Sequence, residues 1–208
     1  MKKIAQRMIG IAFMIMFIFV VAGCGNEDAA TTLVSEFRDY IQVKDGEGLY
    51  EQANIEDGTH WTVDDAANVV TMLKDDEEKS AEIMAVLAAQ GQHYDAEGDK
   101  NKAYDLYDDV TKVGPFYITE EDDEFILNAR SYDVTIVTEP DATITFLDEE
   151  YVANEAGEVS VGKIGPGYYE LTGTLETEDG QVEKEDSFFM FEFDTFAPTV
   201  FLEFDDED

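Results

Sequence analysis

Residues 132–147 read YDVTIVTEPDATITFL, and this stretch decides how the second half of the chain folds. Apolar and polar residues alternate from Tyr132 to Ile136, a period of two that is typical of a strand with one buried face. The run stops at Glu-Pro-Asp, residues 139–141, and a second run follows at residues 143–147. Two such runs around a turn predict a β-hairpin.

The rest of the C-terminal half repeats this pattern. Turn residues at 165–167 (Gly-Pro-Gly) and 179–180 (Asp-Gly) separate further short apolar runs. Several short strands at this spacing are typical of an antiparallel sandwich or barrel. We therefore expect an antiparallel β-sandwich domain over residues 114–204, followed by an acidic tail at 205–208. The further strand candidates are residues 157–161, 168–175, 188–193 and 199–204.

Upstream of this domain the apolar period is that of helices. Residues 62–65, Thr-Val-Asp-Asp, have the form of a capping box, so a helix is predicted to begin at Thr62. An earlier helix starts near Leu33, a short one surrounds Leu49, and a later one, capped by Ser80, ends at Gly91. The pattern predicts a small helical domain over residues 33–91. Residues 92–113 give mixed signals and are expected to be a connector. The fold class is thus α+β.

The start of the chain has the features of an export signal. Lys2, Lys3 and Arg7 precede an uncharged run, residues 8–23, that ends in Val-Ala-Gly before Cys24. An uncleaved membrane anchor is the alternative, but the run is shorter than the roughly 20 residues that cross a bilayer. Val-Ala-Gly-Cys resembles the lipobox of bacterial lipoproteins. That resemblance implies a signal peptide over residues 1–23, cleavage between Gly23 and Cys24, a lipid on the Cys24 sulfur, and a tether over 24–32.

The mature chain is strongly acidic. Without residues 1–23 it holds 10 basic residues against 49 acidic ones, a formal charge of −39. Such a surface repels nucleic acid, so we expect no nucleic-acid partner. Two explanations of the acid excess stay open. One is specific binding of cations or of a basic partner. The other is adaptation to the salty or alkaline surroundings of a Gram-positive bacterium, and we favour it because the acidic residues are scattered along the chain.

No residue pattern points to catalysis. His60 and His93, the only histidines, lack metal-ligand spacing, and no metal or cofactor is expected. Carboxylate pairs carry no weight among 49 acids, and no nucleophile motif occurs. Trp61, just before the Thr62 cap, is expected to pack on its own helix rather than to stack on a ligand. The run FFMFEF at residues 188–193 is interpreted as core in preference to a binding face.

Two stretches resemble a known family. Residues 33–90, with 104–180, resemble the extracellular second and third domains of the TcaA family, the teicoplanin-resistance-associated membrane proteins of Gram-positive bacteria. The similar motifs are Val113-Gly114 before an aromatic strand, the Tyr132 strand, and Pro166-Gly167-Tyr168, which also resembles the Pro-Gly-x-Tyr of PEGA-type surface domains. The usual zinc ribbon and transmembrane helix of the family are replaced here by the lipobox.

The resemblance implies an Ig-like or PEGA-like sandwich and a role in cell-wall homeostasis or in the response to wall-active antibiotics. We therefore expect a non-enzymatic protein on the outer face of the cytoplasmic membrane, held by lipid on Cys24. Its expected partners are envelope proteins or a wall polymer. The alternative is a ligand- or cation-binding lipoprotein that serves a transporter or receptor.

Overall fold

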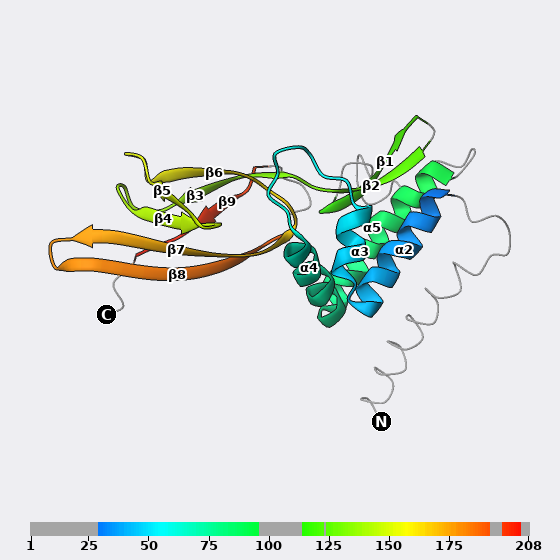
Figure 1. Cartoon of the computed structure of the whole chain (residues 1–208), viewed down its shortest axis with the longest axis horizontal. Helices are drawn as coiled ribbons and strands as arrows, with labels where there is room; N and C mark the ends of the chain where they lie inside the picture. Colours follow the sequence, from blue (N-terminus) through cyan, green and yellow to red (C-terminus); the bar gives the residue numbers. More distant parts are fainter. Residues whose placement is uncertain (1–28, 96–113, 123, 192–196, 205–208) are drawn as a thin grey trace, which may run out of the picture.

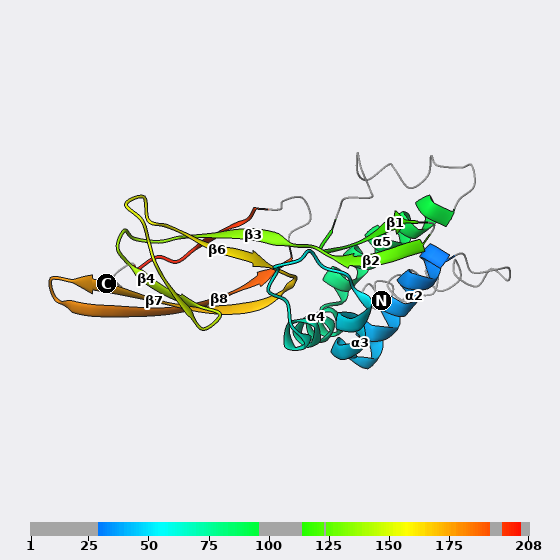
Figure 2. The same ribbon diagram turned by 45° about the horizontal axis from the view of Figure 1, so that its top comes forward.

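The computed structural model describes residues 29–95, 114–122, 124–191 and 197–204. Four helices come first in these ranges and nine strands follow, so the fold is α+β as expected. The helices gather at one end of an elongated molecule and most strands at the other (Figure 1). A view turned by 45° keeps the same end-to-end arrangement (Figure 2).

The helical part is organised by local capping. Helix α2 spans Ala29–Val43, α3 Gly46–Gln52, α4 Val63–Asp75 and α5 Glu77–Asp95. The capping box at Thr62 is confirmed, because the Thr62 hydroxyl accepts from the Asp65 amide and the Asp65 carboxylate accepts from the Thr62 amide. Asp76, not Ser80, caps α5 by accepting from the amides of Glu78 and Lys79.

Two expected boundaries in this region are corrected. Helix α2 begins at Ala29, inside the segment expected to be a tether, and α5 continues through Gly91 to Asp95. Gly91 lies within α5, where its missing side chain lets α2 pack closely: a Cβ there would lie 3.2 Å from the Val34 side chain. The remainder of the expected connector lies outside the described residues.

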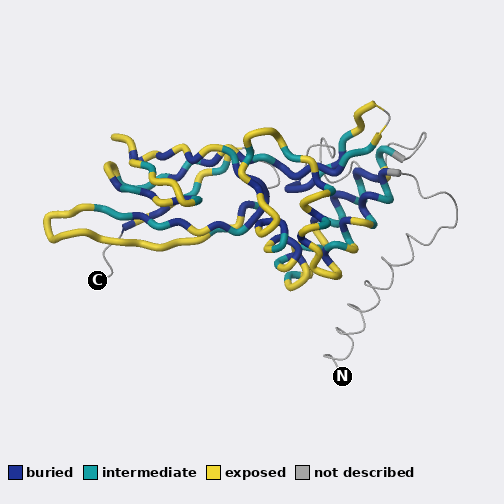
Figure 3. Tube along the Cα trace, viewed as in Figure 1, coloured by how far each residue is buried: buried dark blue, intermediate teal, exposed yellow. Residues whose placement is uncertain are grey.

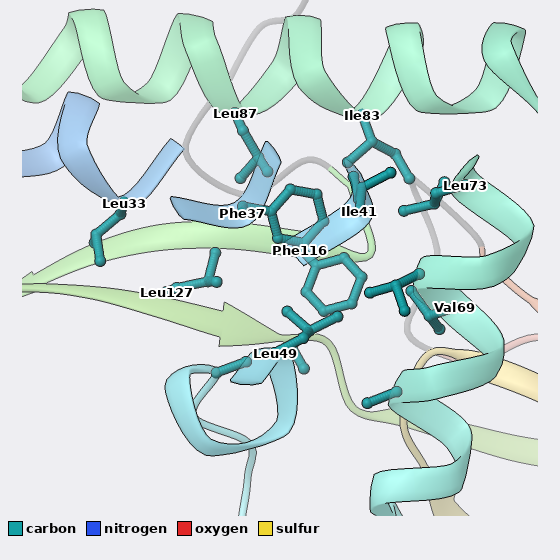
Figure 4. Close-up of a cluster of buried hydrophobic side chains, with 14 of the residues drawn as sticks. Leu33, Phe37, Ile41, Leu49, Val69, Leu73, Ile83, Leu87, Phe116 and Leu127 are labelled. Atoms are coloured by element: carbon teal, nitrogen blue, oxygen red, sulfur yellow. The ribbon is translucent and has the colours of Figure 1, made fainter. Parts of the chain in front are cut away.

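The helices share their core with a β-hairpin that the sequence did not reveal. Strands β1 (Phe116–Glu121) and β2 (Glu124–Ala129) pair antiparallel, and the buried side chains Phe116 and Leu127 pack with those of the helices (Figure 4). Ile118 belongs to the same core. The buried Gln90 side chain accepts from the Ile118 amide. The β domain was expected to start at residue 114, but the packing joins residues 116–129 to the helices.

A second core begins at Tyr132 and lies between two sheets. One sheet has the order β6-β3-β9, with β3 Tyr132–Val137, β6 Glu158–Ile164 and β9 Thr199–Phe201. The other has the order β5-β4-β7-β8, with β4 Thr143–Phe146, β5 Glu149–Val152, β7 Gly167–Thr177 and β8 Gly180–Met190. Side chains from both sheets form one cluster: Tyr132, Val134, Ile136, Ile144, Phe146, Val159, Ile164, Tyr169, Leu171, Met190 and Leu202.

Two expectations about strand pairing are wrong. The strands at residues 132–137 and 143–146 do not form a hairpin, because β3 pairs with β6 and β9 whereas β4 pairs with β5 and β7. The sheets are also not wholly antiparallel, since β9 runs parallel to β3. Residues 138–142 connect β3 in one sheet to β4 in the other. Ala142, at the end of this connection, is buried in the second core.

Candidate functional site

An open groove runs between helix α4 and the β7–β8 hairpin. Its cavity volume is about 480 Å³, and its surface is largely apolar. Its lining residues come from α4 and from the start of β7 and the end of β8. These elements lie where the two ends of the molecule meet (Figure 1). The lining residues are Asn68, Thr71, Met72, Asp75, Asp76, Tyr168 and Phe189.

The aromatic wall of the groove follows from strand register. Tyr168 of β7 pairs with Phe189 of β8, and their ring centroids are 4.9 Å apart. Neighbouring residues on a strand point to opposite faces, so the burial of Tyr169 and Met190 in the second core turns Tyr168 and Phe189 outward. Phe189 is 41% exposed. A large exposed aromatic side chain beside a second one is a typical contact surface for a ligand or partner.

The opposite wall is the outer side of α4. Val69 and Leu73 are buried against the helical core, which leaves Thr71 and Met72 toward the hairpin. The helix ends at Asp75, and Asp76 caps the next helix, so two carboxylates stand at one end of the groove. The result is an apolar floor with an acidic rim.

Two lysines already lie on this rim. The Lys44 ammonium is 3.1 Å from the Asp75 carboxylate, with both side chains exposed. The Lys79 ammonium lies 5.6 Å from the centroid of the Phe189 ring, within the range of a cation–π interaction. The negative field of the rim and the negative face of the ring therefore both attract cationic side chains.

The segment between α3 and α4 holds the two walls in place. Asn54 bridges to Asn128 of β2, and the His60 amide donates to the Lys163 carbonyl at the end of β6. The Trp61 indole donates to the Pro166 carbonyl at 2.9 Å. A Cβ on Gly165 would lie 2.5 Å from the Trp61 ring, so the ring and the β6–β7 turn approach as only glycine allows. Helix α4 is thus fixed against the start of β7.

A buried tyrosine supports the same turn. The Tyr169 hydroxyl donates to the Gly165 carbonyl at 3.0 Å, four residues earlier in the chain. Burial raises the pKa of Tyr169 far above its ordinary value, and the nearby Asp65 carboxylate raises it further. Tyr169 therefore stays a neutral hydrogen-bond donor and keeps Tyr168, its neighbour, facing the groove.

Of the candidate metal-ligating and lipid-bearing residues named from the sequence, none in the described part lines the groove. Gly23 and Cys24 lie outside the described residues. The His60 ring is 3.8 Å from Asp65, and His93 packs against the Tyr94 ring. Within the described ranges, no three His, Cys, Asp or Glu side chains gather as a metal site requires. Trp61 is buried, and its ring lies 5.4 Å from that of Tyr50 in α3 and 6.4 Å from that of Phe116 in β1, both outside the helix on which it was expected to pack.

The interpretation of residues 188–193 as core is wrong for Phe189. Phe188 and Met190 pack in the second core, and Phe191, after the strand ends, packs in the helical core 6.2 Å from Phe116. Phe193 lies outside the described residues. Because every position from 188 to 191 is apolar, the alternation of inward and outward side chains leaves no trace in the sequence. The residue that could have indicated the outward position of Phe189 is Tyr168, its partner on β7. Using it requires knowing how β7 and β8 pair, which the sequence does not show.

Comparison with family models, with curated proteins and with solved structures finds no match to this chain. Among the described helices, none combines the length and the apolar character needed to cross a bilayer.

Proposed function

We propose that this chain is a non-enzymatic, lipid-anchored protein of the cell envelope that acts by binding a partner through the groove between α4 and the β7–β8 hairpin. The observation that carries the proposal is the pair of outward aromatic rings, Tyr168 and Phe189, facing Met72 across a mainly apolar surface. Exposed aromatic groups that are held rigidly from behind typically anchor protein contacts.

The anchoring part of the proposal rests on the lipobox. Lipid on Cys24 would hold the protein at the outer face of the cytoplasmic membrane, and stable anchoring would need two or more acyl chains. The described part begins at Ala29, five residues after Cys24, so helix α2 would start close to the membrane surface. Partners would then be other envelope proteins or a wall polymer.

The finer fold and the cellular role follow from the resemblance to TcaA and PEGA-type domains. The hydrogen bond from Tyr169 to Gly165 supports an Ig-like or PEGA-like sandwich, because a tyrosine hydroxyl that donates to a backbone carbonyl a few residues upstream is a feature of such folds. The parallel pairing of β9 with β3 is the point at which the sheets depart from a purely antiparallel pattern. The role we propose is in wall homeostasis or in the response to wall-active antibiotics.

Complementation of a deletion strain tests this function. We expect deletion to change the minimal inhibitory concentration of a glycopeptide antibiotic and the natural gene to restore it. Cys24→Ala should leave the protein unanchored and fail to restore it, and Phe189→Ser should be anchored but also fail. Thr145→Ser, an exposed position of β4 outside the groove, is the matched control and should restore resistance fully.

Three results would contradict the proposal. Unchanged susceptibility after deletion would contradict the cellular role. Full restoration by Cys24→Ala would contradict anchoring, and full restoration by Phe189→Ser would contradict binding through the groove. Detergent phase partitioning of each variant shows which proteins carry lipid, and circular dichroism shows which are folded.

A further inference from the structure

The groove has a chemical preference that its walls define. Building on the proposed function, we propose that it binds an arginine side chain carried by an apolar segment of a partner protein. The aliphatic stem of the arginine would lie on Met72 and Tyr168, and its guanidinium would stack on Phe189 near the acidic rim. Arginine fits better than lysine because a guanidinium is planar, weakly hydrated and able to stack on an aromatic face.

The first support is the balance of surface types in the groove. Its floor is almost wholly apolar, while two carboxylates, Asp75 and Asp76, stand at its rim. Asp75 pairs with the exposed Lys44, and Asp76 accepts from two backbone amides of α5, so both carboxylates have partners within this chain. An apolar ligand alone would gain nothing from the negative charge of this rim, and a small cation alone would gain nothing from the floor. A long side chain that is apolar along its length and positive at its end uses both.

The second support is charge complementarity around the groove. Glu170 lies two residues beyond Tyr168 on the same face of β7, and it is exposed. On β8, Glu185 lies four residues before Phe189 and shares its face. The whole chain carries a formal charge of −36. A positive segment of a partner would be attracted to this surface at a distance as well as in contact.

The third support is the position of Lys79. Its ammonium already lies over the Phe189 ring, at 5.6 Å from the centroid, so the ring face accepts a cation in this conformation. Lys79 is exposed at the first turn of α5, and its ammonium is held by a single surface interaction of modest strength. A guanidinium from a partner would take the place of this internal cation.

Titration with a pair of matched peptides tests the preference. The lipidated mature protein in detergent micelles, with ¹³C-labelled methionine methyl groups, is titrated with acetyl-Gly-Leu-Arg-Leu-Gly-amide. The second probe has citrulline, which has the shape of arginine and no charge, in place of the arginine. We expect the arginine peptide to shift the Met72 methyl signal saturably and to bind at least about 3-fold more tightly than the citrulline peptide.

Variants of the groove separate its parts. Phe189→Leu keeps an apolar side chain but removes the aromatic face, so it should weaken arginine binding roughly 2- to 5-fold and leave citrulline binding nearly unchanged. Lys79→Gln removes the internal cation and should tighten arginine binding by a similar factor. Lys184→Gln is the matched control, because Lys184 is exposed on the opposite face of β8 and its removal changes the net charge equally.

The rim has its own pair of variants. Asp75→Asn should weaken binding of the arginine peptide, whereas Asp133→Asn, an exposed carboxylate on β3 of the other sheet, should not. Equal effects of these two substitutions would show that only the overall charge matters and would overturn the inference. Equal affinities for the arginine and citrulline peptides would overturn it too. Complementation by Phe189→Ser answers the separate question of whether the groove is used at all.

Discussion

Tyr169 supports the turn between the two sheets from inside the second core. Its hydroxyl is buried and donates to the Gly165 carbonyl, while its ring packs 5.9 Å from that of Phe146 in the second core. The same turn presents Pro166 to Trp61. Tyr169 thus holds the β6–β7 connection from the second core, and Trp61 holds it from the helical part.

Replacing this tyrosine should measure the bond directly. Tyr169→Phe keeps the ring and leaves the buried Gly165 carbonyl without that donor, so we expect the free energy of unfolding to fall by about 1–2 kcal/mol. Tyr151→Phe is the matched control, since its hydroxyl donates to the exposed Glu149 and should contribute less than about 0.5 kcal/mol. Urea unfolding followed by circular dichroism gives both values. Equal losses would contradict the role of the buried bond.

The raised pKa of Tyr169 also predicts a dependence of stability on pH. The pKa is higher in the folded protein than in the unfolded chain, where it is near 10. Above pH 10 the unfolded state loses this proton while the folded state keeps it, so the free energy of unfolding falls as pH rises.

The slope attributable to Tyr169 is about 1.4 kcal/mol per pH unit above pH 10. We expect Tyr169→Phe to remove that part of the slope, so that the stabilities of variant and wild type converge between pH 10 and 11. Urea unfolding at half-unit steps from pH 8 to 11 tests this. Parallel curves would show that Tyr169 ionises alike in both states.

At the scale of elements, the β7–β8 hairpin leaves one edge of its sheet exposed. β8 is an edge strand, and its residues from Gly180 to Ser187 are exposed along the whole length of the hairpin arm (Figure 3). An exposed edge offers unpaired backbone groups to another chain. Glu183, Lys184, Glu185 and Asp186 place charges on that edge, which is the usual protection against such pairing.

Removing these charges should therefore promote association. In the triple variant Glu183→Gln, Glu185→Gln and Asp186→Asn we expect light scattering at 37 °C and low salt to rise earlier than in wild type. The control neutralises the same number of exposed acids on the helices: Glu36→Gln, Asp39→Asn and Glu47→Gln. If both variants aggregate at the same rate, net charge rather than the edge strand controls solubility.

At the scale of the whole molecule, the acid excess opposes folding by self-repulsion. The mature chain holds 49 acidic residues against 10 basic ones, and the pairs Lys44–Asp75 and Lys163–Glu56 lie on exposed side chains. Most carboxylates in the described part therefore face water rather than a basic partner of this chain. Salt screens such repulsion because the Debye length shrinks from about 30 Å at 0.01 M to about 10 Å at 0.1 M.

We expect the melting temperature of the mature chain to rise with sodium chloride, most steeply below about 0.1 M. Calcium chloride at matched ionic strength should give the same rise if the acids act as a solvated surface. A saturable additional rise with millimolar calcium would instead indicate specific cation sites and favour the alternative of a cation-binding lipoprotein. Differential scanning calorimetry in both salts distinguishes the two.

The local pattern of residues was sufficient to predict some of the helices and strands of this protein. The capping box at Thr62 and the alternation from Tyr132 to Ile136 predicted a helix start and a strand correctly, and the α+β class followed. These features depend on interactions between residues a few positions apart, namely amide capping and the burial of one face. The expected lipid on Cys24 also comes from the sequence and stays a prediction.

Only the tertiary structure decided which elements meet. Contacts between distant segments make β3 pair with β6 and β9 rather than with β4. Contacts of the same kind pack the hairpin at residues 116–129 on the helices rather than on the sheets. The groove depends on the same contacts. Phe189 is apolar like its neighbours Phe188 and Met190, which pack in the second core, but it faces α4 instead. The side that a strand residue faces is a property of the packed chain and not of the residue alone.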